Sequence, residues 1–142
     1  MTFVLHALGG EAGVLRLAEA WHRRCLADPI VAHAFSHGFH PDHTRRLAAY
    51  WIEALGGPPR YTGRLGTETS VVAMHSGNGE AADMYAAGAT CFAAALDDVG
   101  LTDAEARREL LTWWAQASAR MAAYPHAADV PAGLSIPRWH DT

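Results

Sequence analysis

A histidine near the end of a short predicted helix is the side chain with the clearest chemical potential in this sequence. The segment Gly66–Gly79 reads GTETSVVAMHSGNG, in which Thr67 can cap a helix that residues 76–79 then stop. Val71 lies four residues before His75, so the imidazole leaves the helix beside apolar side chains. A neutral imidazole in an apolar space can ligate a metal or a metal cofactor. The alternative is a core histidine that hydrogen-bonds to a backbone carbonyl.

Two further histidines lie on the apolar faces of other predicted helices. His22 follows Trp21 and lies four residues after Ala18, and His43 lies four residues before Leu47. Neither has a carboxylate four residues away along its helix that would pair with a buried imidazole. Imidazoles that point inward from three helices indicate a buried polar or metal-bearing ligand.

A second group of histidines offers a competing metal site. His33, His37, His40 and His43 lie within the run HAFSHGFHPDH, and two of them could share a helical face and recruit zinc or copper. The run has no cysteine and no HExxH pattern, so solvated loop histidines are the other interpretation.

The periodicity of apolar residues predicts an all-α fold without strands. The expected helices are a single turn at 2–8, long helices at 11–27, 41–55, 80–99 and 102–124, and short ones at 30–35 and 67–75. Pro41 suits the first position of its helix, and Thr102–Glu105 reads as a capping box. We expect one domain over residues 1–128 and an extended tail over 129–142.

Composition and charge exclude several classes of function. The 142 residues are 50% hydrophobic and 18% charged, which is typical of one globular domain. The formal net charge of −4 and the absence of a run of basic residues argue against a surface that binds duplex nucleic acid. No stretch reads as a membrane span or a signal peptide, so we expect a cytoplasmic protein. Cys25 and Cys91 lack CxxC spacing and are interpreted as buried, reduced thiols.

Five motifs, in their order and spacing, resemble the truncated haemoglobins, most closely their group II branch. They are FVLHALGG (3–10), AWHRRCLADPIVAHAF (20–35), RRLAAYWIEALGGPPRY (45–61), a glycine at 66 followed nine residues later by His75, and CFAAALDDVGL (91–101). The GGP that leads to Tyr61 is the most specific of them. The resemblance covers nearly the whole chain and implies a truncated globin fold, a two-over-two helical sandwich.

The resemblance also implies a haem b held between the helices at 41–55 and 80–99. His75 would be the metal ligand on the proximal side of the iron. His22 and His43 would act on the ligand from the opposite side, as the candidate catalytic residues. The remaining cofactor contacts, carried over by position, are Phe35, Leu47, Tyr50, Trp51, Tyr61, Arg64, Met74 and Gly88.

The sequence departs from the family pattern at three positions of this expected pocket. His22 stands where the family usually has a tyrosine that donates a hydrogen bond to bound dioxygen. Gly88 stands where group II members place an indole, and Met74 where the family has a basic residue close to a propionate. Arg60 or Arg64 could replace that basic residue.

We therefore expect a haemoglobin-like protein with an atypical distal pocket. Its two distal imidazoles could hydrogen-bond an exogenous ligand, bind the iron themselves, or transfer protons in peroxide cleavage. The expected partners are O2, CO, NO or peroxide, an unidentified reductase, and a second copy of the chain as a homodimer. The alternative, favoured by Gly88 and Met74, is a globin-like binding or sensory module that has lost stable haem.

Overall fold

The computed structural model describes residues 1–35, 38–76 and 82–141. The elements within these ranges are α1 (Phe3–Leu8), α2 (Gly10–Ala27), α3 (Pro29–Ala32), η1 (His33–Phe35), α4 (His43–Ala54), α5 (Glu68–His75), α6 (Ala82–Asp98), α7 (Ala104–Met121) and η2 (Ala127–Asp129). The described residues form no strand beyond one isolated bridge between Thr62 and Gly66. The all-α prediction is confirmed.

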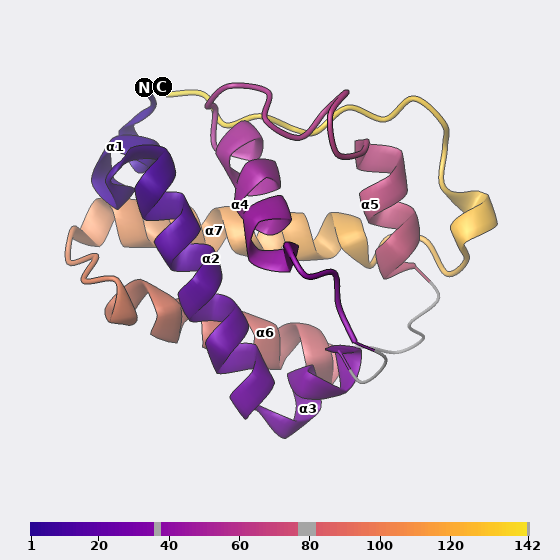
Figure 1. Ribbon diagram of the computed structural model, residues 1–142, viewed down its shortest axis with the longest axis horizontal. Helices are drawn as coiled ribbons and strands as arrows, with labels where there is room; N and C mark the ends of the chain where they lie inside the picture. Colours follow the sequence, from indigo (N-terminus) through magenta and orange to yellow (C-terminus); the bar gives the residue numbers. More distant parts are fainter. Residues whose placement is uncertain (36–37, 77–81, 142) are drawn as a thin grey trace.

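The long helices pack as two pairs. In Figure 1, α2 and α4 lie in front of α6 and α7, and α2 contacts both α4 and α6. The short helix α5 contacts α7, and α3 joins α2 to α6 at the lower edge of the view. This is the two-over-two arrangement that the sequence motifs imply.

The corner between α1 and α2 depends on three glycines. Gly9 and Gly10 have φ angles of +93° and +75°, a left-handed conformation that glycine adopts without steric cost. Gly13 lies so close to the end of α1 that a Cβ atom there would be 1.7 Å from the carbonyl oxygen of Leu8. The close contact of α1 with α2 therefore requires glycine at position 13.

An aromatic cluster forms the centre of the core, between the two pairs of helices. Phe92 stacks on Trp114 with ring centroids 4.2 Å apart, and Trp51 packs edge-on against Phe92 at 5.9 Å. Trp113 and Trp21 complete the cluster from α7 and α2. Trp113 is buried in the main core, and Trp114 is partly buried against it.

Two helix starts differ from the sequence prediction. Pro41 and Asp42 form a turn, in which the Asp42 N–H donates to Nδ1 of His40, and α4 begins at His43. The last helix is capped by Asp103, whose carboxylate accepts from the N–H of Ala106 at 2.8 Å. Because α7 begins one residue after Asp103, Glu105 lies at the second helical position and cannot close the reciprocal bond of a capping box.

The C-terminal segment after η2 is extended and is bound to the rest of the fold. Ile136 is buried in the main core, and the N–H of Trp139 donates to the carbonyl of Ala54 at 2.7 Å. The carboxylate of Asp141 accepts from the N–H of Phe3 at 3.0 Å, so the two ends of the chain lie side by side (Figure 1). A domain boundary near residue 128 stays a prediction.

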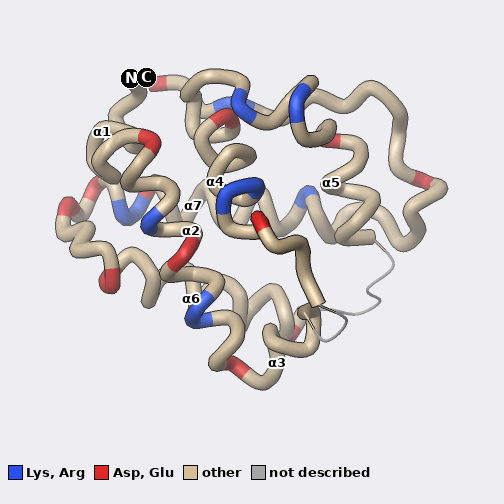
Figure 2. Tube along the Cα trace, in the orientation of Figure 1, with Lys and Arg blue, Asp and Glu red and all other residues tan. Residues whose placement is uncertain are grey.

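Charged residues are spread over the longer helices and the loops, and among the described residues Figure 2 shows no continuous stripe of one sign. Within the described ranges, no helix combines the length and the apolar character that a membrane crossing needs.

Candidate functional site

The helix that carries His75 is fixed at both ends. The Thr67 hydroxyl accepts from the N–H of Ser70 at 3.1 Å, and the Ser70 hydroxyl accepts from the N–H of Thr67 at 3.0 Å. This reciprocal cap starts α5 at the predicted position, and α5 ends at His75 with Ser76 as its C-cap. The predicted stop at residues 77–79 lies outside the described part of the chain.

The ring of His75 is oriented by its own helix. Its Nδ1 lies 2.8 Å from the carbonyl oxygen of Val71. A carbonyl can only accept, so Nδ1 carries the proton and the lone pair of the neutral ring is on Nε2. This tautomer, held by a backbone carbonyl, is the one that metal-binding histidines use.

His22 and His43 meet within an aromatic cage. Their ring centroids are 4.7 Å apart, although one ring comes from the middle of α2 and the other from the first residue of α4. Phe35 lies 5.0 Å from His22 and 5.3 Å from His43. Phe39 lies 4.6 Å from His22 and 5.7 Å from His43. The sequence prediction that both histidines face the interior is confirmed.

Both imidazoles in the cage are neutral at physiological pH. Burial lowers the pKa of His22, and burial together with the neighbouring His22 and His40 lowers the pKa of His43 to about 4. Both ring nitrogens of His22 and Nε2 of His43 are buried without a hydrogen-bond partner among the described residues. Buried polar atoms are rarely left unpaired, so these three nitrogens point to a polar group that the polypeptide does not supply.

The backbone of α6 leaves room for a side chain at Gly88. Gly88 is buried, yet a Cβ atom built on it would meet no atom within 4 Å. The indole of Trp21 donates to the carbonyl of Gly88 at 3.1 Å, so its N–H is already committed to the backbone. One turn before Gly88, the Tyr85 hydroxyl is buried without a partner within the described residues.

A buried carboxylate links α4 to the start of the His75 helix. The Tyr50 hydroxyl donates to Oε1 of Glu68 at 2.5 Å, and the ring of Tyr50 packs edge-on against Tyr61 at 5.5 Å. Burial and the contact with Glu68 raise the pKa of Tyr50, which keeps the phenol protonated and donating. These contacts fix the position of α5, and hence of His75, relative to α4.

The remaining predicted contact residues are divided between core and surface. Leu47 is partly buried against the main core, and Trp51 is buried within the tryptophan cluster. Arg64 is exposed in the loop before α5, and the Met74 side chain is 70% exposed. Arg60 pairs with Glu11 at 2.8 Å, which commits this arginine to α2. The roles of these residues toward a cofactor stay predictions.

The competing histidine run does not form a metal site within the described residues. No group of three metal-ligating side chains occurs there. His33 is exposed, and Nδ1 of His40 accepts from the N–H of Asp42, while His43 turns to the cage. His37 lies outside the described residues.

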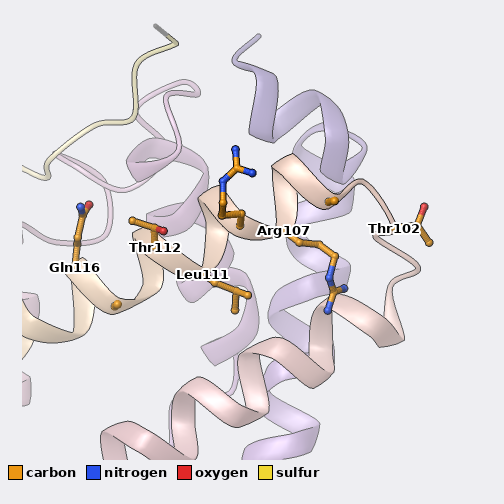
Figure 3. A pocket seen from close by; sticks show the side chains of 8 residues that line it. Thr102, Arg107, Leu111, Thr112 and Gln116 are labelled. Atoms are coloured by element: carbon orange, nitrogen blue, oxygen red, sulfur yellow. The ribbon is translucent and has the colours of Figure 1, made fainter.

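An open depression of about 720 Å³ lies away from these histidines, along the outer face of α7 (Figure 3). Arg107 and Thr102 stand at one end of it and Gln116 at the other, with Leu111 between them. The Arg107 guanidinium already has partners within the protein: it pairs with Asp97 at 2.9 Å and donates to the Leu101 carbonyl. Arg108 also lines the depression, with a largely exposed side chain whose nearest carboxylate, that of Glu109, is 3.9 Å away.

Sequence reasoning missed two members of the site. Phe39 closes the cage from a loop, and only its position four residues after Phe35 could have indicated it. Glu68 is suited to a helix start, where acidic residues are common, and nothing in its neighbours along the chain indicates burial.

Comparisons with known proteins support the fold. A family model for bacterial-like globins matches residues 4–121. The group II truncated haemoglobin from Bacillus anthracis is 21% identical, with a TM-score of 0.75 over 94% of this chain and 97% of that one. No curated protein matches.

Two other solved structures have similar folds. The truncated oxygen-avid haemoglobin from Bacillus subtilis is 24% identical, with a TM-score of 0.68 over 84% of this chain and 98% of that one. A mutant truncated haemoglobin from Tetrahymena pyriformis in its Fe(III) form is 26% identical, with a TM-score of 0.66 over 84% and 97%. Globins bind haem and, at its iron, small ligands. With its match over most of its length and its two-over-two fold, this chain belongs to the bacterial-like globin family and has the fold of a truncated haemoglobin.

Proposed function

We propose that the chain binds haem b with His75 as the proximal iron ligand and holds a small ligand beside His22 and His43. The single observation that carries the proposal is the pair of neutral imidazoles in the cage, whose buried nitrogens lack partners among the described residues. The tautomer of His75, fixed by the Val71 carbonyl, supports its role as ligand.

The residues of the chain fit such a cofactor at two further points. The open space beside Gly88 is on α6, one of the two helices expected to enclose the haem, and one turn away the Tyr85 hydroxyl has no partner among the described residues. Phe35 and Leu47 offer apolar contacts, and Tyr50, Trp51 and Tyr61 are buried in the main core. Arg64 and Met74 are exposed, so we assign them to the edge of the haem at most.

Haem would supply an iron that binds small ligands and exchanges electrons. The chain would add hydrogen-bond donors beside the bound ligand. Because His22 and His43 are neutral near pH 7, each ring carries one N–H that can donate a hydrogen bond to a ligand with partial negative charge. A pKa of about 4 makes His43 a poor proton store at that pH. We therefore favour reversible ligand binding over peroxide cleavage, in a cytoplasmic protein served by a separate reductase.

The first test is an absorption spectrum of the purified chain as isolated, after dithionite, and after CO. A Soret band that shifts at each step is expected, and His75→Ala should abolish the shifts. His126→Ala, a matched change at an exposed histidine, should leave them intact. No Soret band after reconstitution with haem would refute the proposal and leave a globin domain that acts without haem.

The second test addresses the two distal histidines. In His22→Leu or His43→Leu, bound O2 should lose one hydrogen bond from an imidazole. A bond of about 1.4 kcal/mol corresponds to an O2 dissociation rate about ten times faster. CO is a poorer hydrogen-bond acceptor, so its dissociation should change less. If neither variant changes the ratio of the O2 and CO dissociation rates, the distal assignment is wrong. Sharp visible bands before CO would instead show that a histidine of the cage binds the iron.

A further inference from the structure

Two cysteines from different helices meet beside the cage. Cys25 of α2 is fully buried and Cys91 of α6 is 6% exposed, and together with Val31 they form a small cluster separate from the main core. Both side chains belong to the same buried cluster, and neither is in a disulfide. The proposed binding of haem by His75 involves neither cysteine.

The pair lies one turn from residues of the proposed ligand pocket on both helices. Cys25 follows His22 by three residues, and Cys91 follows Gly88 by three residues. Trp21 and Phe35 pack against the cysteine cluster, and Phe35 also touches His22. A bond between the two sulfurs would join α2 to α6 at the level of the pocket.

We propose that Cys25 and Cys91 are a peroxide-sensitive dithiol that closes to an intramolecular disulfide between α2 and α6. The proposal depends on the packing of these helices and not on haem binding. It assigns to the chain a second, thiol-based site whose oxidation state would fix or release the wall of the pocket.

The surroundings make the two thiols unequal. Burial raises the pKa of both. For Cys91, the neighbouring Cys25 and Arg24 oppose that rise in pKa while Asp28 adds to it, whereas for Cys25 both Cys91 and Asp28 raise the pKa further. Cys91 is also the more accessible of the two. It is therefore the thiol that a small oxidant should attack first.

The reaction balances with hydrogen peroxide as the oxidant. The Cys91 thiolate attacks one peroxide oxygen, the O–O bond breaks, and hydroxide leaves while Cys91 becomes a sulfenic acid. The Cys25 sulfur then attacks the sulfenic sulfur, the S–O bond breaks, and water leaves. In sum, two thiols and one H2O2 give one disulfide and two waters. Because burial raises the pKa of both cysteines, little of either is thiolate near pH 7. The first step should therefore be slow near pH 7 and faster at higher pH.

The test is intact-mass and peptide analysis of the full-length holoprotein after H2O2, with N-ethylmaleimide added under denaturing conditions to alkylate free thiols. We expect the mass of two hydrogen atoms to be lost, a linked peptide pair containing Cys25 and Cys91 within one chain, and reversal by dithiothreitol. The rate of disulfide formation should rise with pH. His75→Ala should give the same linkage, because the dithiol does not need the iron; this separates failure of the present proposal from failure of haem binding.

Single variants establish the order of attack. Cys25→Ala should accumulate a dimedone-reactive sulfenic acid on Cys91, whereas Cys91→Ala should leave Cys25 as a thiol. Full alkylation of both cysteines after peroxide treatment of the wild-type chain, or linkage only between two chains, would overturn the proposal. The wild-type measurement alone decides this, even if a variant fails to fold.

Discussion

The neutral state of His43 predicts a specific dependence of stability on pH. Its pKa falls from an ordinary 6.5 to about 4, chiefly because of burial. Between these two values the unfolded chain binds a proton that the folded chain does not. The free energy of unfolding therefore decreases as the pH falls from about 6.5 toward about 4, and is unaffected by this group above about 6.5. His22, whose pKa burial also lowers, acts in the same direction.

The magnitude follows from the difference between the two pKa values of His43. One pKa unit corresponds to about 1.4 kcal/mol, so the full effect is about 3 kcal/mol. This is a sizeable part of the stability of a small domain, which is about 5–15 kcal/mol.

The assay is urea unfolding at a series of pH values from about 7 to about 4.5. All chains would carry His75→Ala, so that haem binding adds no pH dependence of its own. Over this range, the free energy of unfolding should decrease by about 2–3 kcal/mol more in the chain with His43 than in the chain with His43→Leu. The control, His126→Leu at an exposed site, should lose as much as the parent. Equal losses with and without His43 would refute the conclusion that the fold keeps this imidazole neutral.

Further predictions concern packing and the buried carboxylate. Gly13→Ala should lower the melting temperature strongly, with a cost of about 3 kcal/mol, because its Cβ would overlap the Leu8 carbonyl. Gly88→Ala is the matched control and should be neutral or stabilising by up to about 1 kcal/mol, since its Cβ meets open space in a helix; a similar loss in both variants would contradict this account of the α1–α2 corner. Tyr50→Phe should cost about 1–3 kcal/mol in urea unfolding because the Glu68 carboxylate loses its donor. In a double-mutant cycle, Glu68→Leu should remove most of that cost, and strict additivity of the two changes would argue against the bond.

Helix content and the inward direction of the key histidines could be predicted from the sequence. Apolar residues at helical spacing placed His22 and His43 on buried faces, and Thr67 with the following turn placed His75 at the end of its helix. These features depend on residues close together in the chain. Local spacing was sufficient for them.

Contacts between distant residues could not be predicted in the same way. The bond from Trp21 to the Gly88 carbonyl depends on how α2 packs against α6, and the bond from Tyr50 to Glu68 depends on how α4 and α5 are placed. The start of α4 was misplaced because the side chain of His40 binds the N–H of Asp42, which favours a turn over the helical start that Pro41 suggests. The first two contacts join residues far apart in the chain, so they depend on helix packing. At the start of α4, the sequence fits both a turn and a helix, and the structure has the turn.

The tryptophan cluster also makes the chain an optical reporter of its own core. Trp21, Trp51, Trp113 and Trp114 lie with ring centroids 5.2 to 6.2 Å apart where they touch. At such separations excitation energy moves readily among the indoles, so they emit as a coupled group. A porphyrin bound beside them would accept that energy and quench the emission, whether or not it holds iron. Trp139, which lies in the C-terminal segment, would emit separately, and Trp139→Phe would leave a signal that follows porphyrin uptake alone.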